Sequence, residues 1–522
     1  MFTICGLALT LLIGAYVASR AAGRRLARTS ERALTNLRVR TFAHIHRLSL
    51  AEQTSERRGV FVARVTADID TLSKFTEWGG VAWIVAIAQI VGALALMLVY
   101  SWQLTIPVVL LVIPLLAIVL RMQTALSAAY DLVRTRVGEM LSEVSESVMG
   151  AGVVRAYGLE EQTDIRVKRS IHQRYRAQVS AHFRAATMFP IAVVFWGIAL
   201  SVVVLVGTSF GPEWGLTFGR TAAFLFLADL FLHPFVDLPE IYSQTQTAIS
   251  GWRKVLAVLD LPIEIVEPSP GVELPHGSTS IVADGVSYSY RQGRPVVRDV
   301  DAEISRGAHV AIVGQTGSGK TTFAKLLARL ADPREGRILV DGTDLREISP
   351  ASRRAVIRMV PQDGFLFDVT VRDNVRAGHE GATDRDVDTT IEELGLAGWV
   401  TSLPDGLDTR VGERGDALSV GERQLVSLAR ARIGDPGLLI LDEATSAVDP
   451  ATEHRVSEAL RRMSAGRTTV TIAHRLSTAE AADQILVFDD GRVVERGSHS
   501  ELVEAGGVYA RLHQSWLGTV RT

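Results

Sequence analysis

The chain is 522 residues long, carries a formal net charge of −2 and is 47% hydrophobic. This length exceeds that of one typical folding unit, so we expect two or more domains. The balanced charge argues against binding a polyanion such as nucleic acid. The single cysteine, Cys5, excludes an internal disulfide, and no grouping of Cys and His has the spacing of a zinc site, so redox and structural-metal roles are not expected.

Five apolar stretches in the first half of the chain are long enough to cross a membrane as helices, which takes roughly 17–25 residues. They are residues 2–18, 81–100, 104–120, 189–206 and 216–235. Buried soluble helices are the alternative, but five such runs are hard to bury in half of a soluble chain. A secretory signal at the N-terminus is a further alternative, which the basic residues contradict because they follow the apolar run instead of preceding it. We therefore predict an all-α transmembrane domain with five spans over residues 1–260.

The basic residues predict how this domain is oriented. Lys and Arg are concentrated in residues 20–74 and 121–184, whereas the connections at 101–103 and 207–219 contain neither. By the positive-inside rule the basic segments lie in the cytoplasm, together with the second half of the chain. Apolar residues at helical intervals from 33 to 48 predict that spanning helices continue into the cytoplasm. The sequence thus predicts an integral protein of the plasma membrane whose second half is cytoplasmic.

A different pattern follows the membrane half. Residues 261–276 contain four prolines and are predicted to form a linker, and strands alternate with glycine turns over residues 277–522, as in an α/β domain. The strongest motif there is a phosphate-binding loop (P-loop) that lies between a strand-like and a helix-like stretch, which is its required context. Its backbone N–H groups and its lysine would bind the phosphates of ATP, and its first threonine would ligate Mg²⁺. The predicted nucleotide-binding residues of this loop are Gly314, Gln315, Thr316, Gly317, Ser318, Gly319, Lys320, Thr321 and Thr322.

A pair of acidic residues completes the expected ATPase chemistry. The apolar stretch 438–441 reads as a buried strand and ends in Asp442 and Glu443. We expect Asp442 to hold Mg²⁺ from a strand adjacent to the P-loop strand, and Glu443 to polarise the water that attacks the γ-phosphate. Such a strand is ordinary by itself, but together with an upstream P-loop it predicts ATP hydrolysis.

The segment Leu-Ser-Val-Gly-Glu-Arg-Gln at residues 418–424 resembles the signature motif of ATP-binding cassette (ABC) proteins. By this resemblance Tyr290 stacks on adenine, Gln362 contributes to catalysis and to the metal site, Asp449 is the D-loop aspartate, and His474 is the catalytic switch histidine. Ser419 and Gly421 would contact the nucleotide of a partner subunit. Residues 411–415 resemble a loop that exporters carry before the signature, and segments near 48–58 and 149–159 resemble short coupling helices. The resemblance implies a multi-domain, dimeric protein: an exporter-type helical membrane domain followed by an α/β P-loop ATPase domain with a helical subdomain.

Two departures from the family pattern affect this interpretation. Six spans are usual, and we interpret the absence of the first as a missing start of the chain rather than a true five-span half. The signature reads Ser-Val-Gly-Glu where the family has Ser-Gly-Gly-Gln, whereas Lys320, Asp442, Glu443 and His474 keep the pattern. A valine side chain and an added negative charge would weaken the nucleotide site that this signature serves. We therefore favour a heterodimer with a second half-transporter over a homodimer.

The sequence leaves the transported substrate open. Four ionisable residues lie in or beside the last predicted span, either on a transport path or paired between helices: Arg220, Asp229, His233 and Asp237. The exported hydrophobic or amphipathic molecule could be a drug, a lipid, a peptide or a siderophore, and membrane lipid is a further expected partner. An importer built on the exporter fold and a regulatory nucleotide-binding subunit with little turnover are the alternatives, and the retained Glu443 argues against the second.

Overall fold

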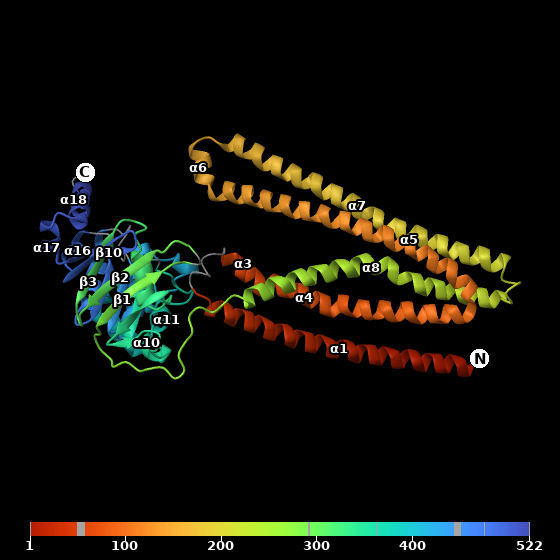
Figure 1. The fold of residues 1–522 in the computed structure, drawn as a ribbon, viewed down its shortest axis with the longest axis horizontal. Helices are drawn as coiled ribbons and strands as arrows, with labels where there is room; N and C mark the ends of the chain where they lie inside the picture. The colour runs from red at the N-terminus through yellow and green to blue at the C-terminus, as the bar shows by residue number, and fades with distance from the viewer. Residues whose placement is uncertain are drawn as a thin grey trace. The chain divides into compact units, whose positions relative to one another are not determined.

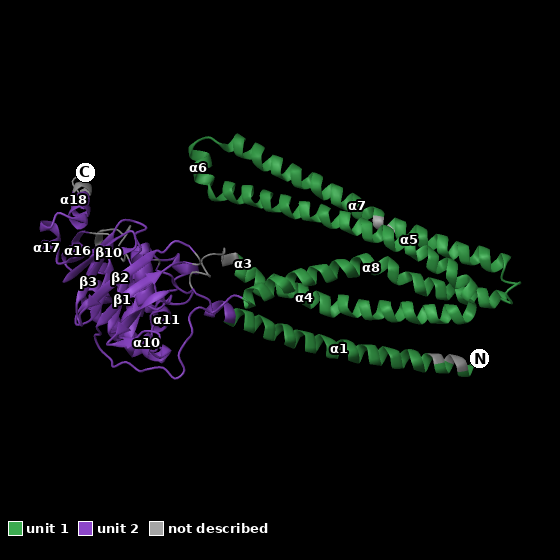
Figure 2. Ribbon diagram, in the orientation of Figure 1, with its two compact units in different colours: residues 1–43, 59–260 green, residues 44–58, 261–522 purple. Residues whose placement is uncertain are grey.

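The structure, a computed structural model, describes residues 2–49, 58–290, 293–362, 364–442, 450–473 and 476–520. It divides into two compact units (Figure 2). The first contains residues 1–43 and 59–260, and the second contains residues 44–58 and 261–522. The predicted domain boundaries are 1–260, 261–276 and 277–522, and they remain a prediction. Three of the predicted site residues, Glu443, Asp449 and His474, lie outside the described residues.

The first unit is entirely helical. Long helices dominate it (Figure 1). Two π-helical turns lie between α3 and α5 in the chain. In chain order its elements are α1 (Phe2–Arg47), α3 (Arg58–Ala63), η1 (Arg64–Asp68), α4 (Ile69–Lys74), η2 (Phe75–Gly79), α5 (Gly80–Met149), α6 (Ala151–Ala156), α7 (Glu160–Ser209) and α8 (Phe218–Leu259). Figure 1 shows α5 and α7 side by side, joined by the short helix α6, which matches the expected short helix within 149–159.

Three helical stretches among the described residues are long and apolar enough to cross a membrane: Val60–Met149, Glu160–Ser209 and Phe218–Leu259. They contain the predicted spans at 81–100, 104–120 and 189–206 and nearly all of that at 216–235. The span predicted at 2–18 lies on α1 and stays a prediction, and the coupling segment predicted near 48–58 falls mostly outside the described residues.

Helix α5 consists of two arms that separate at Ser101. This residue has an extended backbone (φ −165°, ψ 106°), and its hydroxyl accepts a hydrogen bond from the Leu104 N–H at 3.3 Å, as a helix N-cap does. The two arms pack with α7 and α8 in one apolar core that includes Met97, Leu104 and Phe224. The predicted break at 101–103 between two spans is therefore present.

The second unit contains two sheets and a helical subdomain. A four-stranded antiparallel sheet has the order β2-β1-β4-β5, and a six-stranded sheet has the order β10-β9-β3-β8-β7-β6, in which only β10 is antiparallel to its neighbour. The strands are β1 (Ile281–Tyr288), β2 (Val297–Ile304), β3 (His309–Gly314), β4 (Glu335–Val340), β5 (Thr343–Asp344), β6 (Ile357–Val360), β7 (Leu438–Asp442), β8 (Thr468–Ile472), β9 (Gln484–Asp489) and β10 (Arg492–Gly497).

The helical subdomain packs around its own apolar core. It contains α11 (Val371–Arg376), α12 (Asp384–Glu393), α13 (Ala397–Ser402), η3 (Gly406–Asp408), η4 (Glu413–Gly415) and α14 (Val420–Arg432). The other helices of the unit are α9 (Lys320–Leu327), α10 (Pro350–Val356), α15 (Pro450–Ser464), α16 (Leu476–Glu480), α17 (His499–Glu504) and α18 (Val508–Val520). An α/β domain with a helical subdomain is thus confirmed.

One detail of the predicted sheet is wrong. Asp442 was expected on a strand adjacent to the P-loop strand, but β8 lies between β7 and β3. Asp442 pairs with Ile472 of β8, and Ile472 pairs with Ile312 of β3. Strand order depends on pairing between segments far apart in the chain, which an apolar run cannot specify.

The proline-containing segment 261–276 belongs to the second unit and contacts the rest of it without forming a helix or a strand. Val272 bridges to Ile348, and the Leu274 N–H donates to the Ser352 hydroxyl at 2.8 Å. The Glu267 carboxylate accepts hydrogen bonds from Arg353 and from Arg329, whose side chain is almost fully buried. These contacts fasten the segment along its length.

Candidate functional site: the P-loop, the signature helix and a membrane pocket

The P-loop connects β3 to α9, and its backbone conformation requires glycine. Gly319 directly precedes α9 with φ +104°, and an added Cβ there would lie 2.6 Å from the Val296 carbonyl oxygen. At Gly314, with φ +150°, a Cβ would lie 2.2 Å from the Phe488 carbonyl oxygen. Side chains at these positions would force the loop apart. The loop therefore leaves its backbone uncovered by side chains at the start of α9, and backbone N–H groups at the start of a helix bind anions.

Polar side chains of the loop are held close to this backbone. The Lys320 ammonium donates to the carbonyl oxygens of Gly314 and Gln315 at 2.7 and 2.8 Å, and the residue is only 5% exposed. The Ser318 hydroxyl is buried and has no hydrogen-bond partner within the described part of the chain. A buried hydroxyl without a partner is costly, and a phosphate oxygen would satisfy it. These features fit a bound nucleotide phosphate.

The predicted adenine-stacking residue also lies near the P-loop. The Tyr290 hydroxyl shares a 3.0 Å hydrogen bond with the Thr322 hydroxyl on α9. Its ring packs edge-on against Tyr288, with centroids 5.1 Å apart. The structure thus brings Tyr290, Thr322 and the P-loop together, although they come from separate parts of the sequence.

The predicted metal ligands are oxygen donors on three different elements. Asp442 is the buried last residue of β7, Thr321 is the second residue of α9, and Gln362 follows β6 and is exposed. A carboxylate, a hydroxyl and an amide carbonyl are the hard oxygen ligands that Mg²⁺ prefers. The donor set therefore fits Mg²⁺.

The signature segment forms the beginning of α14. Ser419 caps this helix: its hydroxyl accepts from the Glu422 N–H at 3.3 Å, and the Glu422 carboxylate accepts in return from the Ser419 N–H at 2.8 Å. Val420 occupies the first helical position and is 48% exposed, whereas Gly421 is buried. Ser419 and Val420 are thus both exposed at this helix end.

Both carboxylate oxygens of Glu422 are used within the helical subdomain. One accepts from the Ser419 N–H, and the other accepts from the indole N–H of Trp399 at 3.1 Å. Burial raises the pKa of Glu422, but these hydrogen bonds and the nearby Arg455 together lower it by more. The pKa of Glu422 is therefore below its usual value. The sequence did not single out Trp399, because a tryptophan 23 residues upstream has no fixed relation to a helix cap.

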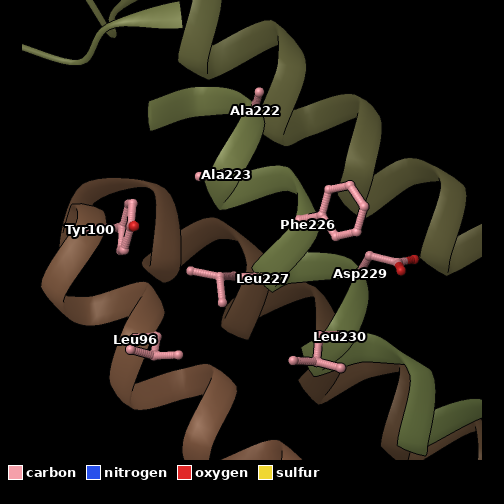
Figure 3. Close-up of a pocket in the computed structure, with 8 residues that line it drawn as sticks. All are labelled: Leu96, Tyr100, Ala222, Ala223, Phe226, Leu227, Asp229 and Leu230. Carbon is pink, nitrogen blue, oxygen red and sulfur yellow. The ribbon is translucent and has the colours of Figure 1, made fainter. Parts of the chain in front are cut away.

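A pocket of about 640 Å³ lies between the first arm of α5 and α8 (Figure 3). Seven of the eight residues that line it are apolar or aromatic, and the remaining one is Asp229. They are Leu96, Tyr100, Ala222, Ala223, Phe226, Leu227, Asp229 and Leu230. A mainly apolar cavity with a single charged group is typical of sites for amphipathic ligands.

The four ionisable residues predicted near this region differ in their surroundings. Asp229 is partly buried and accepts a 3.1 Å hydrogen bond from the indole N–H of Trp196 on α7. Asp229 therefore both joins two helices and lines the pocket. Arg220 lies near the start of α8, and His233 and Asp237 are exposed. Tyr100 and Phe226, which line the pocket, and Trp196, which donates to Asp229, were not predicted.

Comparisons with known proteins extend over both units. Residues 2–235 match the family described as "ABC transporter transmembrane region", and residues 297–446 match that described as "ABC transporter". The chain is 35% identical over 507 residues to the "Fatty acid ABC transporter ATP-binding/permease protein" of Mycobacterium tuberculosis, covering 97% of this chain and 80% of that protein. It is 33% identical over 503 residues to the "ATP-dependent lipid A-core flippase" of Shewanella oneidensis, covering 94% and 82%.

A solved structure is similar as well. The structure titled "Structure of a bacterial Atm1-family ABC exporter with ATP bound" superposes with a TM-score of 0.78 at 28% sequence identity, covering 93% of this chain and 85% of that one. The similarity therefore includes the helical unit, the ATPase unit and their order along the chain.

Proposed function

Because the chain belongs to the ABC transporter family, as an exporter half whose membrane domain is fused to its own ATPase domain, we propose that it exports a lipid-like amphipathic molecule with a neutral or cationic polar group. The pocket between α5 and α8 is the observation that carries this proposal. Its apolar lining favours a hydrocarbon tail, and the Asp229 carboxylate favours a hydrogen-bond donor or a positive charge over a carboxylate head group. The names of relatives that act on fatty acids and lipid A support a lipid-like cargo.

ATP binding and hydrolysis take place at the second unit. The P-loop backbone, Lys320 and Ser318 bind the phosphates, and Tyr290 stacks on the adenine. Thr321, Asp442 and Gln362 would hold Mg²⁺, which would neutralise phosphate charge. Glu443 orients the attacking water, and His474 contacts the γ-phosphate. Since one nucleotide contacts both subunits, with Ser419, Gly421 and Asp449 of this chain at the dimer interface, ATP favours the closed pair of ATPase units.

The cargo proposal is tested by substrate-stimulated ATPase activity in lipid nanodiscs. Two probes with similar tails are compared, oleate and oleylamine, and we expect stimulation by the amine and little by the fatty acid. Asp229→Leu combined with His233→Leu should abolish the stimulation and leave basal turnover intact. The matched control is Asp237→Leu, which removes an exposed carboxylate of the same helix. Unchanged stimulation in the double variant, or stimulation by oleate alone, would contradict the proposal.

We also propose that the functional unit is a heterodimer. The support is an asymmetry within this chain: the P-loop and the acidic strand end keep the family pattern, whereas the signature departs from it at Val420 and Glu422. In such a pair this chain contributes Glu443 to one competent site and its variant signature to the other.

The pairing is tested by purifying the chain alone and measuring ATPase activity against Glu443→Gln. No turnover alone, with turnover restored by a co-expressed second half-transporter, supports the heterodimer. Turnover of the chain alone that is lost in Glu443→Gln establishes an active homodimer instead.

A further inference from the structure

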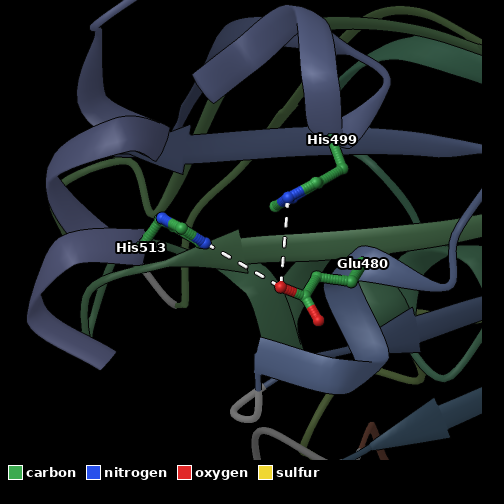
Figure 4. A group of neighbouring side chains, drawn as sticks. All are labelled: Glu480, His499 and His513. Carbon is green, nitrogen blue, oxygen red and sulfur yellow. Dashed lines mark ion pairs between the residues drawn. The ribbon is translucent and has the colours of Figure 1, made fainter. Parts of the chain in front are cut away.

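Three potential metal ligands meet near the C-terminal end of the second unit (Figure 4). Glu480 is the last residue of α16, His499 is the first residue of α17, and His513 lies on α18. We propose that these three side chains form a binding site for a divalent transition-metal ion of the Zn²⁺ type. This site is separate from the P-loop, and the inference does not depend on the transported substrate.

The geometry of the three groups carries the proposal. Both histidines direct Nε2 toward the same carboxylate oxygen of Glu480, at 3.9 Å for His499 and 3.8 Å for His513. The three ligand atoms lie within 4.8 Å of one another. In a tetrahedral zinc site with bonds of about 2.0–2.1 Å, neighbouring ligand atoms are about 3.3 Å apart. Side-chain adjustments of about an ångström would therefore close the group around one ion.

The supporting structure keeps His499 in a ligating orientation. Its Nδ1 shares a 2.7 Å hydrogen bond with the hydroxyl of Tyr509, which is fully buried. When Nδ1–H donates to this oxygen, the Nε2 lone pair points at Glu480. Metal-bound histidines usually have such a partner on their other ring nitrogen.

The helices that carry the ligands are fixed to the sheet. Ala479, Leu502 and Tyr509 belong to one apolar cluster with residues of β3 and β9. The ligands themselves are accessible, because the side chain of Glu480 is 44% exposed and those of His499 and His513 are 30% and 15% exposed. Three ligands that are accessible to solvent leave a fourth coordination position for water. Two imidazoles and one carboxylate suit Zn²⁺ better than Mg²⁺ or Ca²⁺.

The ligand spacing explains why sequence analysis did not predict this site. Residues 480, 499 and 513 are separated by 19 and 14 positions, unlike the short spacings of zinc motifs. An ion here would join α16 to the two C-terminal helices. Since α16 begins at Leu476, two positions after the predicted switch residue His474 in the sequence, occupancy would restrain the helix that follows this residue.

Zinc binding is measured by calorimetry on the full chain in nanodiscs, purified without a polyhistidine tag, freed of metal with EDTA and kept free of nucleotide. We expect one high-affinity site per chain, and Co²⁺ in its place should give the absorption of a tetrahedral complex. Glu480→Gln and His513→Gln, which alter accessible side chains, should each weaken binding at least about tenfold. Tyr509→Phe should weaken it by about 10- to 100-fold through the lost hydrogen bond to His499.

The matched control is His454→Gln, which removes an exposed histidine of α15 outside this group. It should leave the affinity unchanged, and circular dichroism should show all variants folded. Zinc affinity that is equal in wild type, Glu480→Gln and His513→Gln would overturn the proposal. So would wild-type binding no tighter than that of the double variant Glu480→Gln with His513→Gln.

Discussion

Replacing Glu422 with glutamine makes the signature more similar to the family pattern, yet we expect it to destabilise the helical subdomain. The carboxylate accepts two hydrogen bonds, from the Ser419 N–H and the Trp399 indole N–H. A glutamine amide has one accepting oxygen, so its NH₂ group must face one of these two donors. Trp399 is 3% exposed, and an unsatisfied buried donor costs about 1–3 kcal/mol.

The expected loss is large enough to measure by calorimetry of the full chain. A change of 1–3 kcal/mol lowers the transition temperature of a unit of this size by roughly 2–12 °C. Trp399→Phe removes the second donor, so Glu422→Gln should cost less in that background, with a coupling of about 1 kcal/mol. The matched control is Glu392→Gln, an exposed glutamate on α12 of the same subdomain.

Two results would refute this reasoning. One is a Glu422→Gln transition at or above that of the wild type. The other is an equal cost of Glu422→Gln in the wild-type and Trp399→Phe backgrounds, because it would show that the indole bond contributes nothing. If the negative charge of Glu422 were instead the main defect of the signature, the variant would raise ATPase activity without any loss of stability.

Substitutions at three further positions test the other regions. Gly319 has a φ of +104°, and Gly319→Ala places a Cβ against the Val296 carbonyl oxygen. We therefore expect the variant to bind a fluorescent ATP analogue at least about tenfold more weakly. Unchanged affinity would contradict the P-loop assignment. Asp229→Asn keeps an oxygen that accepts from the indole N–H of Trp196, so its thermal transition should stay near that of the wild type. Asp229→Leu removes this acceptor and should lower the transition temperature. Equal transition temperatures of the two variants would show that this hydrogen bond does not stabilise the fold. The hydrogen bond from Arg353 lowers the pKa of the Glu267 carboxyl below its ordinary value, against the opposing effect of burial. The ionised carboxylate therefore stabilises the fold fully above the pKa of the unfolded chain, and this contribution is lost as the pH falls through the lower pKa of the folded state. Glu267→Gln should therefore cost about 1 kcal/mol at neutral pH, and its transition should converge with that of the wild type in acid; a constant difference would refute the ion pair.

Local patterns predicted much of the fold. The spans at 81–100 and 104–120 were evident from their length and hydrophobicity, and the short break between them is the reversal at Ser101. The order of β3, β8 and β7 was not predictable, because it depends on pairing between strands separated by long stretches of chain. The contacts of segment 261–276 were missed for the same reason: Glu267 meets arginines 62 and 86 positions away.

The candidate functional site likewise combines features that the local sequence predicts with features that depend on distant contacts. The P-loop is a continuous segment whose glycines, lysine and hydroxyls could all be named from the sequence, and the structure places them between β3 and α9; their role in nucleotide binding stays a prediction. Tyr290 was identified by family resemblance, and its bond to Thr322 adds a contact that no motif contains. The pocket between α5 and α8 was missed because its lining is ordinary apolar sequence that becomes a cavity only when the two helices pack.

The structure adds local contacts to the two departures of the signature from the family pattern, whose effect on the nucleotide site stays a prediction. Glu422 was counted as a negative charge facing the partner's nucleotide, but its two oxygens accept hydrogen bonds within its own subdomain, and this lowers its capacity to repel a phosphate. Val420 makes no such compensation: it is 48% exposed at the first position of α14, where the family has glycine. A phosphate that approaches the N–H groups of this helix end must come past a branched side chain. We therefore expect the shape of Val420 to weaken the nucleotide site that this signature serves more than the charge of Glu422 does.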